Sequence, residues 1–463
     1  MNVGRSGFIL LVVDSLRADH SDILLNYAKM YRRNFRYHSG IAPASNTIQS
    51  HASLFTGLPP CIHGVHERRD SKLLSYAYIP SNLRERLLHL RLSTLQYKSM
   101  LMSANPFVSP MFGYVGFNMY FDLWTSDRRR SFISKSEKIF LETLSSTIPS
   151  KKQRIAYLFR HAKFDLLLKM LLEKIPAPKH WSNDMWPRDK GGTKLVRIFE
   201  HLAKKAPSLI TSSFIFINIM EVHEPYIRDD NFTKNQREIL LHNKLLNADM
   251  VKLWRRAYKR QVYQAAKVLH EILDILEDSK LIDDLTIIIT SDHGQLLGEH
   301  GFIGHGIFLF DELLRIPIFI RLPTYVDDVN LSEVVECNMN NICMISLLDL
   351  YYIVLEIATH NRLPKLCRDA AFAESYVVYE PRAPPHEKIR VVEKPLIAVY
   401  SNGYKLVYNS NNDNVVYLSK INNGDKPIND PDLEKVMLRK IKNYLRNCAF
   451  VQKLEKLRRK LRS

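Results

Sequence analysis

Short runs of apolar and β-branched residues recur along the chain, and each run stops abruptly at a polar residue. The runs cover residues 8–13, 214–220 and 285–290, and residues 92–124 contain a further strand and loop. None of them has a helical period, so they predict buried strands of a parallel sheet. The pattern therefore favours an α/β fold.

Helices are predicted where apolar positions recur three and four residues apart. Residues 234–278 are predicted to be helical, with the clearest apolar face in residues 258–277. A short helix is predicted over residues 50–55, because Gly57 and the prolines beyond it are typical of a helix end. An apolar helix is predicted over residues 344–357.

The last part of the chain follows a different pattern. Residues 395–408 predict a β-hairpin with Asn402-Gly403 at its turn, and residues 415–418 predict a further strand. Residues 433–463 predict a strongly basic helix with leucines along one face.

Polar side chains with useful chemistry follow four of the predicted strands. They are Asp14, a loop holding Thr47, His223, and Asp292 with His293. In open α/β sheets ligands bind at the carboxyl ends of the strands, so these groups are expected to converge on one rim. Each also has a structural explanation when taken alone. Asp14 can cap a helix, Thr47 or Ser50 can be an N-cap, and Asp-His-Gly can be an ordinary turn with a surface histidine.

Length and charge limit the classes of function. With 463 residues, of which 46% are hydrophobic, the chain can form one large domain with additions, or two to three domains. Its net charge of +18 favours anionic partners such as phosphate or sulfate esters, acidic membrane surfaces or nucleic acid. Residues 127–205 form a basic, amphipathic stretch, which predicts a helical insertion that is a lid, a partner surface or a solvated face.

The cysteines and the N-terminus give expectations about the compartment. Five cysteines without a CxxC pair argue against a disulfide framework and against a cysteine-built zinc site. The apolar run at residues 8–13 is too short for a signal peptide or a membrane span, and no longer run follows it. We therefore expect an intracellular, soluble, cytoplasmic protein. The cysteines are Cys61, Cys337, Cys343, Cys367 and Cys448.

Taken in order, five motifs resemble the sulfatase branch of the alkaline phosphatase superfamily. They lie at residues 13–20, 47–57, 223–226 and 291–301, and at residues 305–317. The resemblance covers residues 7–323, and a weaker match continues through the C-terminal hairpin. It implies a three-layer αβα sandwich with a mostly parallel central sheet. It also implies a small C-terminal subdomain with an antiparallel sheet and a helix. The expected boundaries are 1–330 for the catalytic domain, including the insertion, and 331–463 for the subdomain.

The nucleophile position departs from that of true sulfatases. Those enzymes oxidise Cys or Ser to formylglycine, whereas the matching residue here is Thr47. Oxidation of threonine would give a ketone, so no formylglycine is expected. Gln49, His51 and Ser15 replace the proline, the arginine and the second aspartate that many sulfatases have. These departures are similar to the threonine branch, such as phosphoethanolamine transferases and metal-dependent phosphomutases, in which the threonine oxygen binds metal and accepts a phosphoryl group.

The resemblance implies roles for individual residues. Asp14, Thr47, Asp292 and His293 are expected to bind a divalent cation, with zinc or manganese favoured and calcium also suitable. His223 and His305 are expected to bind the oxygens of the transferred group, hold a second metal, or protonate the leaving group. We interpret His51 and His300 as structural residues and Arg17 as an ion-pair partner. Asn105 is left outside the site, because its loop lacks the family's lysine and histidine.

These observations predict a metal-dependent hydrolase that cleaves a small anionic ester through Thr47. Phosphate monoesters or diesters are favoured over sulfate esters. One alternative is a phosphoethanolamine-type transferase, and another is an arylsulfatase-type activity without formylglycine. A third is a non-catalytic scaffold that uses its basic insertion and C-terminal helix to bind anionic lipid or nucleic acid.

Overall fold

The chain is described here by a computed structural model. Cys337, Cys343, Cys367 and the basic residues 128–130 lie outside the described residues. The structure describes residues 6–66, 77–123, 141, 144–145, 147–148, 150–161, 163–172, 188–227, 231–242, 244–326, 344–364, 368–376 and 396–462.

An eight-stranded sheet forms the centre of the molecule, in the order β10-β2-β9-β6-β1-β5-β3-β4. Strand β9 is antiparallel to both of its neighbours, and the other pairs are parallel. The predicted, mostly parallel sheet is therefore confirmed. The strands are β1 (Gly7–Val13), β2 (Arg36–Ile41), β3 (Lys98–Ser103), β4 (Met119–Asp122), β5 (Ser213–Ile219), β6 (Leu285–Thr290), β9 (Arg315–Arg321) and β10 (Ile345–Ser346).

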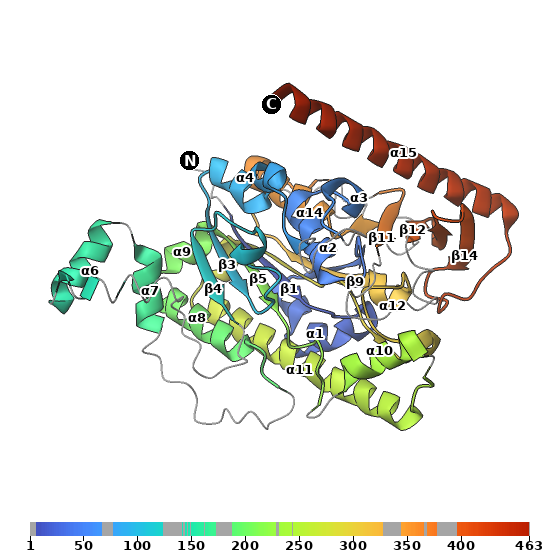
Figure 1. The fold of residues 1–463 in the computed structure, drawn as a ribbon. Helices are drawn as coiled ribbons and strands as arrows, with labels where there is room; N and C mark the ends of the chain where they lie inside the picture. The colour runs from blue at the N-terminus through green and yellow to red at the C-terminus, as the bar shows by residue number, and fades with distance from the viewer. Residues whose placement is uncertain are drawn as a thin grey trace.

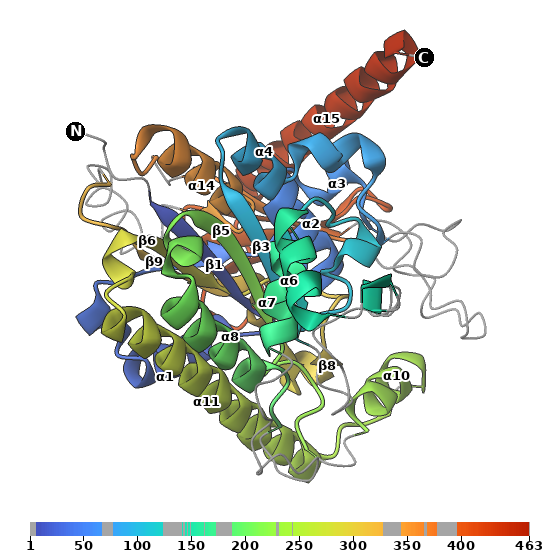
Figure 2. The same cartoon turned by 90° about the vertical axis from the view of Figure 1, so that its left-hand side faces the viewer.

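Helices cover both faces of this sheet, as Figures 1 and 2 show. Successive side chains of a strand point to opposite faces, so alternate residues of β1 enter two separate cores. One core contains α1 (Ser21–Tyr27), α8 (Gly192–Lys205) and α11 (Ala248–Asp278). The other contains α2 (Thr47–Thr56), α4 (Leu88–Thr94) and α14 (Asp349–His360). The three-layer αβα prediction is confirmed.

A second, antiparallel sheet of four strands lies between the main body and the C-terminal helix. Side chains on one face pack against Met437 and Ile441 of that helix, and those on the other join the core of the main body. Asn402 and Gly403 both have positive φ angles, as the predicted hairpin turn requires. The elements are β11 (Ala371–Ser375), β12 (Leu396–Ser401), β13 (Tyr404–Asn409), β14 (Asn414–Lys420) and α15 (Pro431–Arg462).

The stretch assigned to the basic insertion contains two kinds of helix. Helices α6 (Lys151–Arg160) and α7 (Phe164–Leu172) share a small cluster, and Leu168 of α7 also reaches the main core. Helix α8 packs in the main core along its whole apolar face. The end of the stretch is therefore part of the layer that covers the sheet.

Two details differ from the sequence-based expectations. The helix predicted over residues 344–357 begins only at Asp349, because Ile345–Ser346 pairs with β2 at the edge of the sheet. A disulfide joins Cys61 to Cys448, although the cysteine spacing argued against a disulfide framework. These two residues are 387 positions apart, so their spacing in the sequence carries no information about their approach in space.

Several short elements complete the described parts of the chain. None of the helices in those parts is both long and apolar enough to cross a bilayer. The remaining elements are α3 (Pro60–His63), α9 (Pro207–Thr211), α10 (Phe232–His242), α12 (Asp311–Leu314), β7 (Leu296–Leu297) and β8 (Ile303–Gly304).

Candidate active site

The central strands β1 and β6 deliver Asp14 and Asp292 to the same edge of the sheet. Asp14 directly follows β1, and Asp292 is the second residue after β6. Both carboxylates are fully buried. Ser15 turns the chain away from the strand with a φ of 63°, and its backbone N–H donates to Asp292 Oδ1 at 3.2 Å. The turn after one strand therefore fixes the carboxylate that follows the other.

Thr47 reaches this edge as the first residue of α2. The N-cap is Asn46, whose side chain accepts a hydrogen bond from the Gln49 N–H at 3.0 Å. The structural explanation that Thr47 or Ser50 is only the N-cap is therefore wrong. The helix dipole and the free N–H groups of the first turn favour negative charge at this hydroxyl.

Four predicted residues lie within a few ångströms of one another. Thr47 Oγ1 is 3.4 Å from Asp14 Oδ2 and 3.2 Å from His293 Nε2. His293 Nε2 in turn is 3.5 Å from Asp292 Oδ2 and 3.9 Å from Asp14 Oδ1. The sheet edge thus brings Asp14, Thr47, Asp292 and His293 together, and their roles stay predictions.

A backbone contact sets the orientation of His293. Its Nδ1 lies 2.8 Å from the carbonyl oxygen of Gly294, which can only accept, so Nδ1 carries the proton. Nε2 is then an unprotonated acceptor facing the carboxylates. A backbone partner of this kind is what fixes the tautomer of metal-binding histidines in proteins.

The two carboxylates cannot both be ionised at low cost without a cation between them. Burial and the neighbouring Asp14 carboxylate raise the pKa of Asp292 to about 7. Burial also tends to raise the pKa of Asp14, but the positive charge of His223 and the hydrogen bond from Asn105 outweigh it and hold that pKa below its ordinary value. Asp14 is therefore the more readily ionised carboxyl group of the two, and Asp292 the more readily protonated one.

The donor atoms fit a divalent cation. Asp292 Oδ2 is buried and accepts no hydrogen bond from any residue that the structure describes. Ligand atoms of Asp14, Asp292 and His293 all lie within 4.8 Å of one another. An orphaned carboxylate oxygen, an unprotonated imidazole nitrogen and an adjacent hydroxyl form a hard, mixed O/N set, which suits zinc or manganese.

His223 and His305 lie beside this group. The ring centroids of His305 and His293 are 4.5 Å apart, and those of His305 and His223 are 5.2 Å apart. His223 Nδ1 contacts the Glu224 carbonyl oxygen at 2.9 Å, and His305 Nδ1 contacts Gln295 Oε1 at 2.6 Å. Both Nδ1 atoms therefore donate.

The pKa values of the two imidazoles are shifted in opposite directions. Burial lowers the pKa of His305 to about 3. Burial also tends to lower the pKa of His223, but the carboxylates of Glu224 and Asp14 outweigh it and raise that pKa. Near neutral pH, His223 is therefore the more readily protonated of the two.

Three residues near the site were missed by the sequence reasoning. Asn105, which we had left outside the site, donates from Nδ2 to Asp14 Oδ2 at 2.9 Å. Gln295 and Glu224 support the two histidines and contact each other at 3.4 Å. The position of Asn105 at the end of a strand was the one signal that could have indicated it.

The residues interpreted as structural have internal partners. His300 Nε2 lies 3.1 Å from Glu312 Oε2. Arg17 pairs with Asp19 and Glu299. His51 is closer to the chemistry than expected, because its Nδ1 lies 3.0 Å from the Thr47 carbonyl oxygen and 3.5 Å from Asp292 Oδ2.

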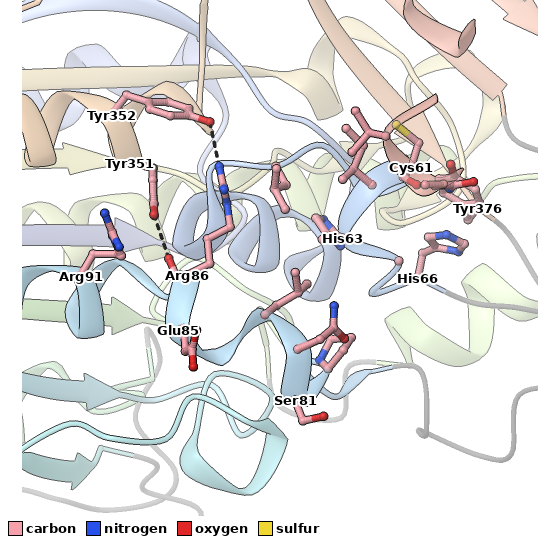
Figure 3. Close-up of a pocket in the computed structure, with 18 of the residues that line it drawn as sticks. Cys61, His63, His66, Ser81, Glu85, Arg86, Arg91, Tyr351, Tyr352 and Tyr376 are labelled. Carbon is pink, nitrogen blue, oxygen red and sulfur yellow. Dashed lines mark hydrogen bonds between the residues drawn. The ribbon is translucent and has the colours of Figure 1, made fainter. Parts of the chain in front are cut away.

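A separate cavity of about 1350 Å³ lies at the opposite end of α2 from Thr47 (Figure 3). Its Arg86 donates from Nε to the Thr56 carbonyl oxygen at 2.6 Å and from Nη2 to the Tyr352 hydroxyl at 3.2 Å. None of the residues around Asp14 and His293 lines this cavity. It is therefore distinct from the candidate active site.

Comparisons with known proteins agree with this geometry. A family model described as Sulfatase matches residues 7–330. The low-salt glycan biosynthesis sulfotransferase of Haloferax volcanii is 34% identical over 98 residues, and the match spans only 20% of that protein and 20% of this chain.

Two solved structures have the same fold. A 2-O GAG sulfatase superposes with a TM-score of 0.62 at 13% identity, covering 96% of this chain and 93% of that chain. The phosphonate monoester hydrolase of Agrobacterium radiobacter superposes with a TM-score of 0.61 at 14% identity, covering 96% of both chains. The resemblance drawn from the motifs is thereby confirmed. Because the family model extends from β1 through β9, the chain belongs to the sulfatase family.

Proposed function

We propose that this protein is a metal-dependent hydrolase of sulfate or phosphate esters, with phosphate monoesters and diesters favoured, and that Thr47 is its nucleophile. The observation that carries the proposal is the position of Thr47 Oγ1, 3.2 Å from His293 Nε2 and 3.4 Å from Asp14 Oδ2 at a helix N-terminus. The family membership and the basic net charge support an anionic ester as substrate.

Asp14, Thr47, Asp292 and His293 would hold the cation. When bound, it would lower the pKa of the threonine hydroxyl and withdraw charge from the ester oxygens. Zinc or manganese suits this set best, and calcium also fits its oxygen atoms. The methyl group on the β-carbon of Thr47 excludes formylglycine chemistry at this position.

The chain's own residues account for the rest of the reaction. Thr47 Oγ1 loses its proton to solvent and attacks the phosphorus or sulfur atom, while the bond from that atom to the departing ester oxygen breaks. The first turn of α2 stabilises the negative charge that develops there. His223 protonates the departing ester oxygen from Nε2, because its pKa is the raised one of the two histidines. His305 is neutral and has its proton on Nδ1, so its Nε2 accepts a hydrogen bond from a protonated oxygen of the transferred group. Water then releases that group from Thr47.

Replacement of Thr47 tests the nucleophile directly. Thr47→Ala should lower kcat for aryl phosphates by at least about 10³-fold, since removal of an attacking hydroxyl abolishes the covalent route. Thr47→Ser should retain much of the activity. Ser53→Ala is a matched control, because Ser53 lies on the same helix but bonds to His63 at 3.1 Å. A Thr47→Ala protein with the activity of the wild type would refute the mechanism.

A panel of aryl phosphate, phosphodiester and sulfate esters on the same sample ranks the substrates. A second candidate function is transfer to an acceptor other than water, as in a phosphoethanolamine-type transferase. The sulfotransferase among the relatives favours it. Turnover that accelerates when alcohol acceptors are added, with product formed on the acceptor, would select transfer over hydrolysis.

A further inference from the structure

The segment just before α8 closes around the turn that carries His223. Lys190 belongs to this segment, and its side chain is buried with only 7% of its surface exposed. Its ammonium group donates to the carbonyl oxygen of His223 and, at 3.4 Å, to that of Glu221. One cation thus binds two carbonyl groups, two residues apart, in the turn after β5.

The side chain of Glu221, in turn, binds the backbone of the segment that carries Lys190. Its Oε1 accepts from the backbone N–H groups of Lys190 at 3.2 Å and Gly192 at 2.7 Å. A Cβ on Gly192 would lie 2.8 Å from that oxygen and 2.3 Å from Val268 Cγ2, so only glycine fits. The two segments are therefore clamped to each other by side chains from both sides.

Such a buried pair is expensive to keep for stability alone. Burial lowers the pKa of Lys190 to about 8 and raises that of Glu221 to about 7. Burying a charged group costs free energy that its hydrogen bonds must offset, and apolar side chains carry no such cost. The stability of the fold therefore gives little reason for a lysine here, and its position points to the site.

The orientation of His223 depends on the backbone that Lys190 holds. His223 Nδ1 is anchored on the Glu224 carbonyl oxygen at 2.9 Å, one peptide beyond the carbonyl group bound by Lys190. A shift of this turn moves the ring and its anchor together. Displacements of the order of 1 Å in catalytic groups can cost about 10²-fold in rate.

We propose that Lys190 is a positioning residue, which fixes the turn at residues 221–224 and so directs Nε2 of His223 toward the bound ester. This inference rests on the proposed function of His223. It also assigns a role to the end of the 127–205 stretch. The segment that leads into α8 is part of the support of the active site.

Lys190→Met tests the inference, and Lys194→Met is its matched control. Lys194 lies four residues further on and donates to the Asp122 carbonyl oxygen at 2.7 Å, on β4 rather than on the His223 turn. Two readouts are needed: steady-state kinetics on an aryl phosphate, and the imidazole ¹⁵N signals of His223, assigned by their loss in His223→Gln.

Lys190→Met should lower kcat roughly 10- to 100-fold with KM near that of the wild type, and should shift the His223 signals. Lys194→Met should leave both unchanged, and Lys190→Arg should recover part of kcat. If Lys190→Met does not fold, Lys190→Gln keeps one donor and serves for the same comparison.

Unchanged His223 signals in the folded Lys190 variant, or equal effects from Lys194→Met, would overturn the inference. The two proposals fail separately. A wild-type protein that cleaves none of the esters contradicts the proposed function, while the His223 signals still show whether Lys190 sets that ring.

Discussion

At the scale of single residues, the site depends on which atoms are left without a partner inside the protein. His293 Nδ1 is taken by a backbone carbonyl group, which leaves Nε2 for a ligand. Asp292 uses Oδ1 for two backbone N–H groups and leaves Oδ2 unsatisfied among the described residues. Buried polar atoms are rarely left in this state, so each one calls for an explanation. A bound cation would satisfy Asp292 Oδ2 and would also face His293 Nε2, which the Thr47 hydroxyl contacts at 3.2 Å.

The raised pKa of Asp292 predicts how cation affinity varies with pH. Below about pH 7 the carboxyl retains a proton that the cation must displace, and above it no proton competes. The dissociation constant should therefore fall about tenfold per pH unit up to about pH 7 and then level off. Calorimetry in buffers of different ionisation enthalpy measures this, with about one proton released per cation at the lower pH. An affinity independent of pH across this range would contradict the assignment.

The sequence located the acidic and imidazole groups of the site but not their supports. Asp14, Asp292 and His223 follow strands whose apolar pattern is clear, so the rule on strand ends was enough to place them. Gln295 and Lys190 carry no such signal, because their roles depend on contacts with residues remote in the sequence. Asn105 was left outside the site because its loop lacks the family's lysine and histidine. Its hydrogen bond to Asp14 needs neither of those residues.

At the scale of elements, segments with a clear apolar pattern were predicted well, and strands without one were not. Strands β1, β5 and β6 follow the predicted ranges closely, and the helical range 234–278 corresponds to α10 and α11. Strand β10 has two residues and exists only because it pairs with β2. Strand β11 contains no β-branched residue, so its composition gave no indication of a strand. Tertiary pairing decides such elements.

The contact between the small sheet and α12 makes a prediction about Lys405 on β13. This fully buried lysine pairs with Asp311 at 2.8 Å and also with Asp425. Lys405→Met would leave both carboxylates buried without a cation, so it should lower the free energy of unfolding by about 3–5 kcal/mol. Urea titration monitored by tryptophan fluorescence measures the change.

An exposed pair of the same type provides the control for Lys405. Lys440 on α15 contacts Asp369, whose side chain is 90% exposed, at 3.0 Å. Lys440→Met should change the free energy of unfolding by no more than about 1 kcal/mol. Equal effects of the two substitutions on the free energy of unfolding would show that the buried Lys405 pair stabilises the fold no more than an exposed pair does.

At the scale of the whole molecule, α15 packs on the small sheet through Met437 and Ile441, and its C-terminal part projects from the body (Figures 1 and 2). The disulfide from Cys448 to Cys61 fastens its middle to α3. Beyond that point Phe450, Leu454 and Leu457 remain exposed beside basic residues. No observation on the described residues identifies a partner for this face. The cytoplasmic location and the anionic membrane or nucleic-acid partner therefore stay predictions.

The basic face of α15 predicts salt-dependent binding to anionic surfaces. Arg446→Glu with Lys453→Glu should weaken binding to phosphatidylserine vesicles by at least about tenfold at low salt, since each basic group contributes about 1 kcal/mol. Co-sedimentation measures it, with a nucleic-acid duplex as the competing ligand. Asp292→Ala should bind as the wild type does. Binding that does not respond to salt would contradict an electrostatic role for the helix.

The most direct test of the account is the metal content of the purified protein, measured by mass spectrometry together with ester turnover. We predict one or more equivalents of zinc or manganese per chain, and loss of both metal and turnover in Asp292→Ala. A protein that takes up no divalent cation after reconstitution and cleaves no ester would contradict the account and favour the non-catalytic scaffold.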